Sequence, residues 1–124
     1  MYWHHWFSIA SFLAGLSVVL GAFGAHILKG KLSPEHLQLF ETAVRYQMYH
    51  ALALFAVAFA STRMDNLVIK LAGLFFILGT LCFCGSLQAL IFIPDSSRWA
   101  GPLTPVGGGL WILSWLMLCL GVLF

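Results

Sequence analysis

Four long apolar runs, separated by short polar connections, decide what this chain can fold into. They extend over residues 6–28, 43–61, 67–93 and 103–124. Each is near or above the roughly 20 residues that a helix needs to cross the hydrocarbon core of a bilayer. Because lipid offers the backbone no hydrogen-bonding partner, each run must be helical there. The sequence therefore predicts an all-α, polytopic membrane protein, a bundle of four transmembrane helices.

The composition supports the membrane class. Of the 124 residues, 61% are hydrophobic and 8% are charged, whereas soluble domains contain about 25% charged residues. The net charge of +2 is small, and no basic stretch is interleaved with aromatic residues, so nucleic acid is not an expected partner. The first seven residues contain no Lys or Arg. We therefore expect the first run to be a membrane helix and not a cleaved signal peptide.

We expect one domain over residues 1–124, with helices at about 6–28, 34–61, 67–93 and 104–124. Ser33, Pro34 and Glu35 supply an N-cap, a first-turn proline and an acid at the positive end of the helix dipole. The second helix should therefore begin before its apolar run. Thr104 and Pro105 repeat this pattern and predict the start of the fourth helix.

Small residues recur at four-residue spacing on two of the expected helices. They are Ser17, Gly21 and Ala25 on the first, and Gly85 and Ala89 on the third. Such stripes allow helix backbones to approach closely in lipid. We expect them to mark helix contacts.

With four crossings, the polar ends of all four helices fall on one side of the membrane. The stretches are GAFGAHILKGK (21–31), FETAVRYQMYH (40–50), CGSLQAL (84–90) and TPVGG (104–108). The opposite side has a tight turn with Arg63 and Asp65. The polar residues of the second helix therefore have possible partners on three other helices.

The same stretches carry a resemblance to a known family. GAFGAH, FETAVRYQMYHALAL, CGSLQAL and TPVGG, in this order, resemble the family named domain of unknown function 423. Its members are small four-helix proteins of bacterial inner membranes, with animal relatives. The resemblance spans nearly the whole chain. It implies a multi-pass protein of the bacterial inner (plasma) membrane, but it names no reaction, because the function of the family is unsettled.

Glu41 and Arg45 are four residues apart, in the favourable order for an ion pair on one helix face. One interpretation is a self-neutralising pair with Arg45 extended to the headgroups. In the other, which we predict, Arg45 points into the bundle to hold an anion, with Glu41 within reach and Thr104 close to the same cavity. His50 lies about 13 Å beyond Glu41 along the helix, so it should face the bundle interior, as a structural hydrogen-bonding group or as a relay or ligand group.

The candidate ligand-binding residues are His26, Glu41, Arg45, Tyr46, His50, Ser86, Thr104, Gly107 and Gly108. Charge on Arg45 and backbone amides at residues 104–108 favour a non-catalytic protein that binds a lipid headgroup, a small anion or a partner helix. Two alternatives stay open: a small oligomeric transporter or channel, with His50 on its route, and an accessory subunit of a membrane complex. The expected partners are membrane lipids and a homo-oligomer or larger membrane complex.

Enzyme and metal signatures are missing from the sequence. It has no H-E-x-x-H, G-x-S-x-G, P-loop or dinucleotide motif. Cys82 and Cys84 form C-x-C inside an apolar run, where small buried residues are common. We expect no catalytic residue, no metal and no cofactor.

Charge in the connections predicts the orientation. Lys29, Lys31 and Arg98 lie on one side, with interfacial Arg45, against Arg63 and Lys70 on the other. The positive-inside tendency then places the polar loops in the cytoplasm and both termini outside, in the periplasm.

Overall fold

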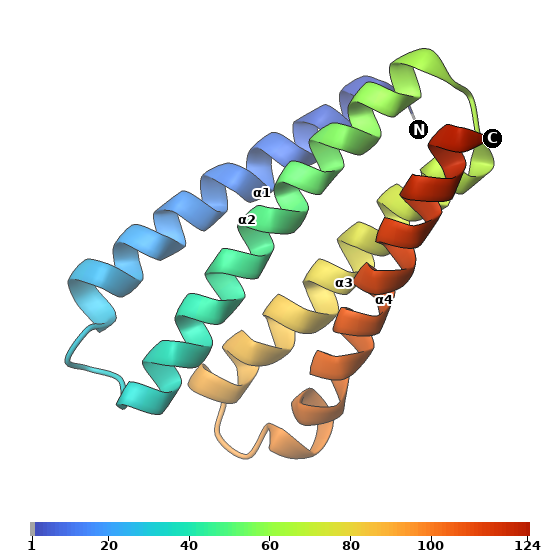
Figure 1. Ribbon diagram of the computed structural model, residues 1–124. Coiled ribbons are helices and arrows are strands. Elements are labelled where there is room, and N and C mark those ends of the chain that lie inside the picture. Colours follow the sequence, from blue (N-terminus) through green and yellow to red (C-terminus); the bar gives the residue numbers. More distant parts are fainter. Residues whose placement is uncertain (1) are drawn as a thin grey trace.

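The computed structural model describes residues 2–124, and every regular element in this range is helical. The elements are α1 (Trp3–Phe23), the π-helix η1 (Gly24–Leu28), α2 (Pro34–Arg63), α3 (Leu67–Phe92) and α4 (Ser97–Leu123). The four α-helices run alternately up and down, side by side (Figure 1). The α1–α2 and α3–α4 loops share one end of the bundle, the loop end, while the α2–α3 turn and both termini share the other, the termini end (Figure 1). The predicted all-α fold is confirmed.

Three helical segments are long and apolar enough to cross a membrane: Trp3–Leu28, α3 and α4. The helix α2 is longer, but it falls outside this class. Its first half carries Glu35, Glu41 and Arg45. Large apolar side chains are exposed along the three apolar segments, including Phe12, Val18, Val19, Leu74, Leu81, Ile112, Leu116 and Leu120. Such a surface suits lipid and not water.

The start of α2 agrees with the prediction. Ser33 is the N-cap residue, and its hydroxyl oxygen accepts a hydrogen bond from the backbone amide of His36 (3.2 Å). Pro34 and Glu35 occupy the first turn. This cap fixes where the polar half of α2 begins, ahead of its apolar half.

The predicted start of the fourth helix is wrong, because α4 begins at Ser97 and not near Thr104. The N-cap residue is Ser96, whose hydroxyl donates to the carbonyl of Ala89 at the end of α3 (2.9 Å). Pro102 and Pro105 lie inside the helix, where each lacks the amide that would bond to the fourth preceding carbonyl. Both prolines are exposed at the loop end, where water or headgroups can solvate the freed carbonyls. The cap pattern in the sequence could not show that a helix would accept both prolines in its interior at this end.

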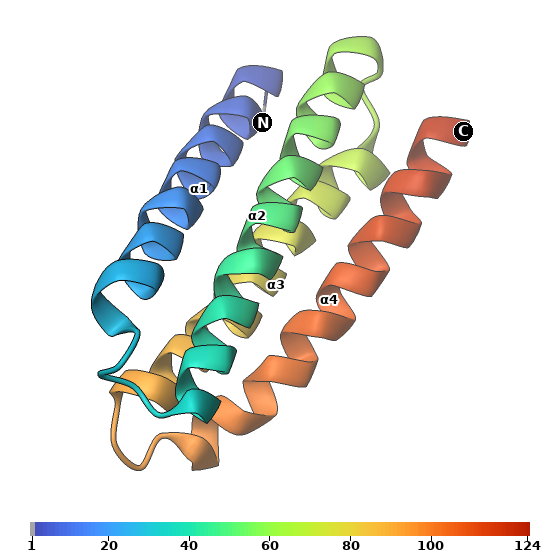
Figure 2. The same cartoon turned by 60° about the vertical axis from the view of Figure 1, so that its left-hand side comes forward.

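The main contacts between helices join α1 to α2, α2 to α3 and α3 to α4. Figure 2 shows α2 between α1 and α4, with α3 behind it. Large buried side chains that hold the bundle together include Trp6, Phe40, Leu54, Val57, Ile69 and Phe76. The helix α2 therefore lies between α1 and the α3–α4 pair, in contact with α1 on one side and with α3 on the other.

The helices α3 and α4 approach each other closely at Gly79 and Gly107. A Cβ atom on Gly107 would lie 2.5 Å from the backbone nitrogen of Phe83 and 2.8 Å from the carbonyl oxygen of Gly79. No side chain fits in that space. The glycine at position 107 is thus a packing residue that brings the two backbones together.

The predicted small-residue contacts are correct only in part. Ser17 is buried, and Gly21 lies against Val44, with 3.6 Å between an added Cβ and the valine side chain. In contrast, Gly85 is exposed and an added Cβ would meet nothing within 4 Å. Periodicity cannot distinguish the inner from the outer face of an apolar helix, because lipid and protein both accept small apolar residues.

We expect Gly107→Ala to lower the free energy of unfolding by about 1–3 kcal/mol, because the added methyl group must displace the backbone of α3. Gly109→Ala is the matched control, since its Cβ would enter open space. Alanine is also the better helix former, so the control should be neutral or stabilising by up to about 1 kcal/mol. Unfolding of both variants by a denaturing detergent provides the measurement, and equal loss of stability in both would contradict the close contact.

Candidate functional site

The predicted site residues do not form one cavity, and the structure divides them between two places. Glu41 and Arg45 lie in a groove between α2 and the end of α1. Tyr46 and His50 lie among aromatic side chains of α3 and α4. His26 is exposed in η1, away from both lining sets. Two different surfaces of α2 are therefore involved.

The groove is small, about 160 Å³, and two glycines create it. Its lining residues are Gly21, Gly24, Ala25, Phe40, Glu41, Val44 and Arg45. A Cβ atom on Gly24 would lie 2.7 Å from the ring of Phe40. The glycine therefore lets Phe40 pack beneath the groove, where this ring is 2% exposed.

The end of α1 changes its helical pitch beside this groove. Residues 24–28 form a π-helical turn, and the amide of Lys29 donates to the carbonyl of Gly24 five residues earlier (3.1 Å). Such π-helical turns are rare in proteins, and those that do occur are often found at functional sites. Here the turn is part of the wall opposite Arg45.

Arg45 does not point into the bundle as predicted. Its side chain is exposed and lines the α1–α2 groove, on a flank of α2 that is separate from the buried face at Ala43, Gln47 and His50. Within residues 2–124 the ion pair is Lys70–Asp65, so the predicted pairing of Arg45 with Glu41 is also absent there. The guanidinium group is consequently available to an outside acceptor.

Gln47 connects α2 to α1 on the inner side. It is 6% exposed, and its Nε2 atom donates to the carbonyl oxygen of Leu13 (3.2 Å). Sequence reasoning did not single out this residue. Its place three residues before His50, with a helical turn between them, was the available signal.

His50 is buried, as its position in the helix predicts, and both of its ring nitrogens have partners. Its Nδ1 atom is 2.7 Å from the carbonyl oxygen of Tyr46. The indole Nε1 of Trp115 donates to its Nε2 atom (3.3 Å). Because a carbonyl only accepts and an indole N–H only donates, the ring is the neutral tautomer with its proton on Nδ1.

The ring of His50 also stacks on Trp111, with centroids 3.7 Å apart and planes inclined by 3°. Trp111 is fixed in turn, because its Nε1 atom donates to the carbonyl of Phe76 (3.3 Å) and to the hydroxyl of Thr80 (3.4 Å). Tyr46, which is 38% exposed, stacks on the same indole at 6.0 Å. This aromatic cluster joins α2 to α3 and α4.

Trp111, Trp115 and Thr80 were not among the predicted site residues. The two tryptophans are four residues apart in an apolar run, which was a readable signal for one shared helix face. Their partner could not be read from the sequence, since His50 is more than 60 positions away.

Ser86 and Thr104 connect α3 to α4 near the loop end. Their hydroxyl oxygens are 2.6 Å apart. Neither Thr104 nor Gly107 lines the Arg45 groove, so this groove is not the common cavity that the sequence predicts. Gly107 and Gly108 lie inside α4, where backbone amides bond within the helix. The predicted anion-binding amides at residues 104–108 are therefore wrong.

In the part of the chain from Tyr2 onward, no three or more His, Cys, Asp or Glu side chains are grouped so that they could hold a metal ion. The cysteines are free: Cys82 is half-buried, Cys84 is buried and Cys119 is exposed. Cys84 donates to the carbonyl of Ala43 on α2 (3.2 Å). Its observed role is thus a contact between helices.

Comparison with known proteins confirms the resemblance seen in the sequence. The family described as "Protein of unknown function (DUF423)" matches residues 20–108. A UPF0382 membrane protein of Bacillus subtilis is 43% identical over 104 residues, which cover 83% of each chain. A UPF0382 membrane protein of Haemophilus influenzae is 39% identical over 104 residues, 84% of this chain and 82% of the relative. No solved structure matches the chain.

We expect His50→Phe to lower the free energy of unfolding by about 1–3 kcal/mol, because the N–H of Trp115 loses its acceptor. Phenylalanine keeps a ring against Trp111, so the change isolates the hydrogen bonds. The double variant His50→Phe, Trp115→Phe removes both partners and should lose less stability than the sum of the single variants, by roughly 0.5 kcal/mol or more. A double-mutant cycle measures this coupling. If the stability losses of the two single variants simply add up in the double variant, the contact between His50 and Trp115 does not stabilise the protein.

Proposed function

Since this chain belongs to the DUF423 family of membrane proteins, we propose that it is a non-catalytic protein of the bacterial inner membrane that binds an anionic lipid headgroup in the groove between α1 and α2. The proposal includes four membrane crossings, with the loop end in the cytoplasm and the termini outside. The observation that carries it is the exposed guanidinium of Arg45, which lies beside a groove formed at Gly21 and Gly24.

The helix α2 can serve as the fourth span in spite of its polar residues. Residues 46–62 contain no Asp, Glu, Lys or Arg, and this stretch is about 25 Å long, close to the ~30 Å of the hydrocarbon core. Gln47 and His50 are hydrogen-bonded to groups within the bundle. Their burial removes the main cost of placing such side chains at membrane depth.

The two arginines of α2 flank this stretch. Arg45 precedes it on the side of the loop end, and Arg63 follows it on the side of the termini end. A long arginine side chain can reach the headgroups while its stem stays against apolar surface. Arg45 would then meet lipid phosphates at the interface, and not the acyl chains.

Guanidinium groups suit phosphate, because their planar N–H donors form paired hydrogen bonds with its oxygens. The groove adds a recess next to the donor, of about 160 Å³, large enough for a compact headgroup and too small for a whole lipid. Lys29 and Lys31 follow η1 in the adjoining loop and offset the negative charge of Glu41. An anionic headgroup is the ligand that this balance favours.

Open glycines support a second candidate, an accessory subunit that binds a partner helix. Added Cβ atoms on Gly85, Gly108 and Gly109 would meet nothing within 4 Å. The bundle itself does not need glycine at these positions, whereas a helix from another chain could approach closely there. This candidate predicts a co-purifying complex that Gly109→Leu disrupts without unfolding the chain.

We expect Arg45→Gln to reduce retention of an anionic phospholipid about tenfold, as befits loss of hydrogen bonds to a charged group. Arg45→Lys should restore part of this loss, since lysine keeps the charge without the planar donors. Glu41→Gln should increase retention, because it removes the negative charge in the groove. Native mass spectrometry of protein mixed with phosphatidylglycerol and phosphatidylcholine gives the retained lipids directly.

Arg98→Gln is the matched control. Arg98 is an exposed cation at the same end of the bundle, and it does not line the groove. Equal losses of phosphatidylglycerol in Arg45→Gln and Arg98→Gln would reduce the effect to general surface charge and refute the groove as a site.

A further inference from the structure

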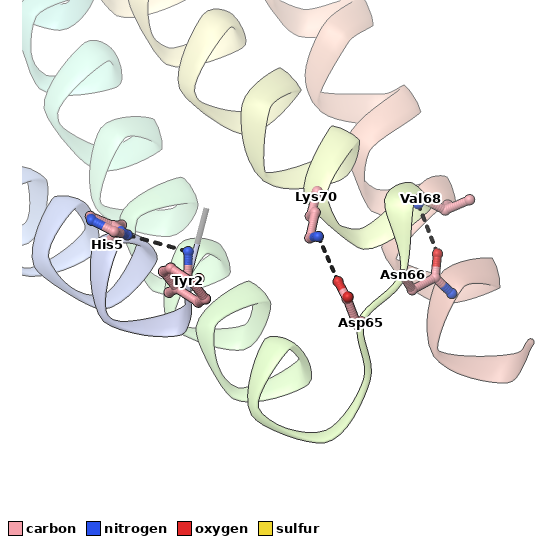
Figure 3. A network of polar contacts seen from close by, with 6 residues as sticks. All are labelled: Tyr2, His5, Asp65, Asn66, Val68 and Lys70. Atoms are coloured by element: carbon pink, nitrogen blue, oxygen red, sulfur yellow. Dashed lines mark hydrogen bonds and ion pairs between the residues drawn. The ribbon is translucent and has the colours of Figure 1, made fainter.

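A second cavity lies at the termini end of the bundle, whereas the Arg45 groove lies toward the loop end. Its volume is about 530 Å³, and its lining residues are Tyr2, Trp3, Ser61, Met64, Asp65 and Lys70. These residues come from the start of α1, the end of α2 and the beginning of α3. Figure 3 shows Tyr2 on one side and the Asp65–Lys70 pair on the other. Nothing in the proposed function uses this cavity.

The cavity is lined by a negative and a positive group, Asp65 and Lys70, whose side chains are 88% and 40% exposed. Lys70 and Asp65 form an ion pair, with 2.5 Å between Nζ and Oδ1. The hydrogen bond from Lys70 lowers the pKa of the Asp65 carboxyl below its usual value, so the carboxylate is ionised at neutral pH. The two charges cancel, which gives the site a dipole without net charge.

The turn that carries Asp65 is held in place by its neighbour Asn66. The side-chain oxygen of Asn66 accepts from the amide of Val68 (2.8 Å), which caps α3 (Figure 3). Its Nδ2 atom donates to the carbonyl of Gly121 at the end of α4 (3.0 Å). The backbone that carries Asp65 is therefore held in place by contacts with α3 and α4.

Ser61 adds a polar group that lacks a partner. Its hydroxyl oxygen is buried and makes no hydrogen bond within the described chain, although the residue lines the cavity. Buried hydroxyl groups are nearly always hydrogen-bonded, so an orphan one points to a missing partner. The wall of the cavity thus includes a hydroxyl group without a partner, in addition to the ammonium group of Lys70.

Aromatic and apolar surface borders these polar groups. Tyr2 and Trp3 are 72% and 48% exposed, as expected of residues at the level of the lipid headgroups. Trp3 also lines an apolar groove of about 220 Å³ with Phe7, Phe55, Ala58, Phe59 and Thr62. A ligand with a polar head and an apolar chain would find surface for both parts.

We propose that this cavity binds the phosphoethanolamine headgroup of a zwitterionic phospholipid in the leaflet at the termini end. The phosphate accepts hydrogen bonds from Lys70 and Ser61, and the ammonium group donates to Asp65 beside the ring of Tyr2. An anionic headgroup that pairs with Lys70 would leave the Asp65 carboxylate without a cationic partner. A choline headgroup has no N–H to donate to the carboxylate, so phosphatidylethanolamine fits the pair of charges better than either.

Lipid competition tests the proposal. Protein mixed with equal amounts of phosphatidylethanolamine, phosphatidylcholine and phosphatidylglycerol should retain the first preferentially in native mass spectra. Lys70→Gln and Ser61→Ala should each reduce this retention, by about tenfold for the charged partner. Arg63→Gln is the control, because Arg63 is a cation one turn from the site that does not line this cavity. No preference for phosphatidylethanolamine, or equal losses in Lys70→Gln and Arg63→Gln, would overturn the proposal.

An exchange of the two charges separates ligand binding from structural pairing. The double variant Asp65→Lys, Lys70→Asp keeps an ion pair and reverses the dipole, while the bilayer fixes which end of the headgroup faces the acyl chains. Retention of phosphatidylethanolamine should fall to the level of Lys70→Gln, with the thermal midpoint unchanged. Unaltered retention would contradict headgroup recognition. If the exchanged variant does not fold, the comparison of Lys70→Gln with Arg63→Gln decides.

The source of the headgroup is tested with soluble phosphoethanolamine. Excess of this compound should leave the bound phospholipid in place, because it lacks the apolar chains. Complete displacement would mean that the site takes the free compound and would overturn the assignment to lipid. Arg45→Gln should reduce retention of phosphatidylglycerol and Lys70→Gln that of phosphatidylethanolamine, so the two sites succeed or fail separately.

Discussion

The polar side chains of α2 need hydrogen-bond partners within the protein, and the rest of the structure depends on this constraint. A histidine and a glutamine inside a membrane protein must form hydrogen bonds with other groups of the protein, because the surrounding lipid offers no donors or acceptors. His50 finds a carbonyl of its own helix and the indole of Trp115, and Gln47 finds a carbonyl of α1. These bonds tie the central helix to its neighbours on both sides. The close contact of Gly79 with Gly107 then brings α4 near enough for Trp111 to stack on His50.

This arrangement explains why so much polar chemistry precedes the apolar half of α2. The inner-face residues Gln47 and His50 are used in holding helices together, with their polar atoms occupied. Arg45, on the outer flank, has no carboxylate partner within the described chain and lines a groove. One helix thus carries structural polar groups on one face and a candidate binding group on another. The termini end also combines a structural polar group with an unpaired one. Asn66 holds the turn in place, while the hydroxyl of Ser61 has no hydrogen-bond partner within the described chain.

The sequence predicts those parts of this fold that depend on local chemistry. The cap at Ser33 is correct because its side chain bonds three residues away, and the burial of His50 follows from its depth in the helix. The predicted start of α4 is wrong. Thr104 and Pro105 match a cap pattern, but the helix begins after Ser96, whose side chain bonds to Ala89. The direction of Arg45 depends on how α2 is rotated against α1. Gly24, Phe40 and the π-helical turn lie where α2 meets the end of α1, and their contact cannot be read from charge spacing.

The central claim is that α2 crosses the membrane with its polar residues satisfied inside. Single cysteines introduced as Lys31→Cys, Thr62→Cys and Ser97→Cys, after Cys82, Cys84 and Cys119 are replaced by alanine, test it most directly. All three positions are exposed, in or next to the connections between helices. A membrane-impermeant thiol reagent should label Thr62→Cys from outside intact cells, and the other two only after permeabilisation. Labelling of all three from the same side would show that α2 does not cross, and would contradict the account.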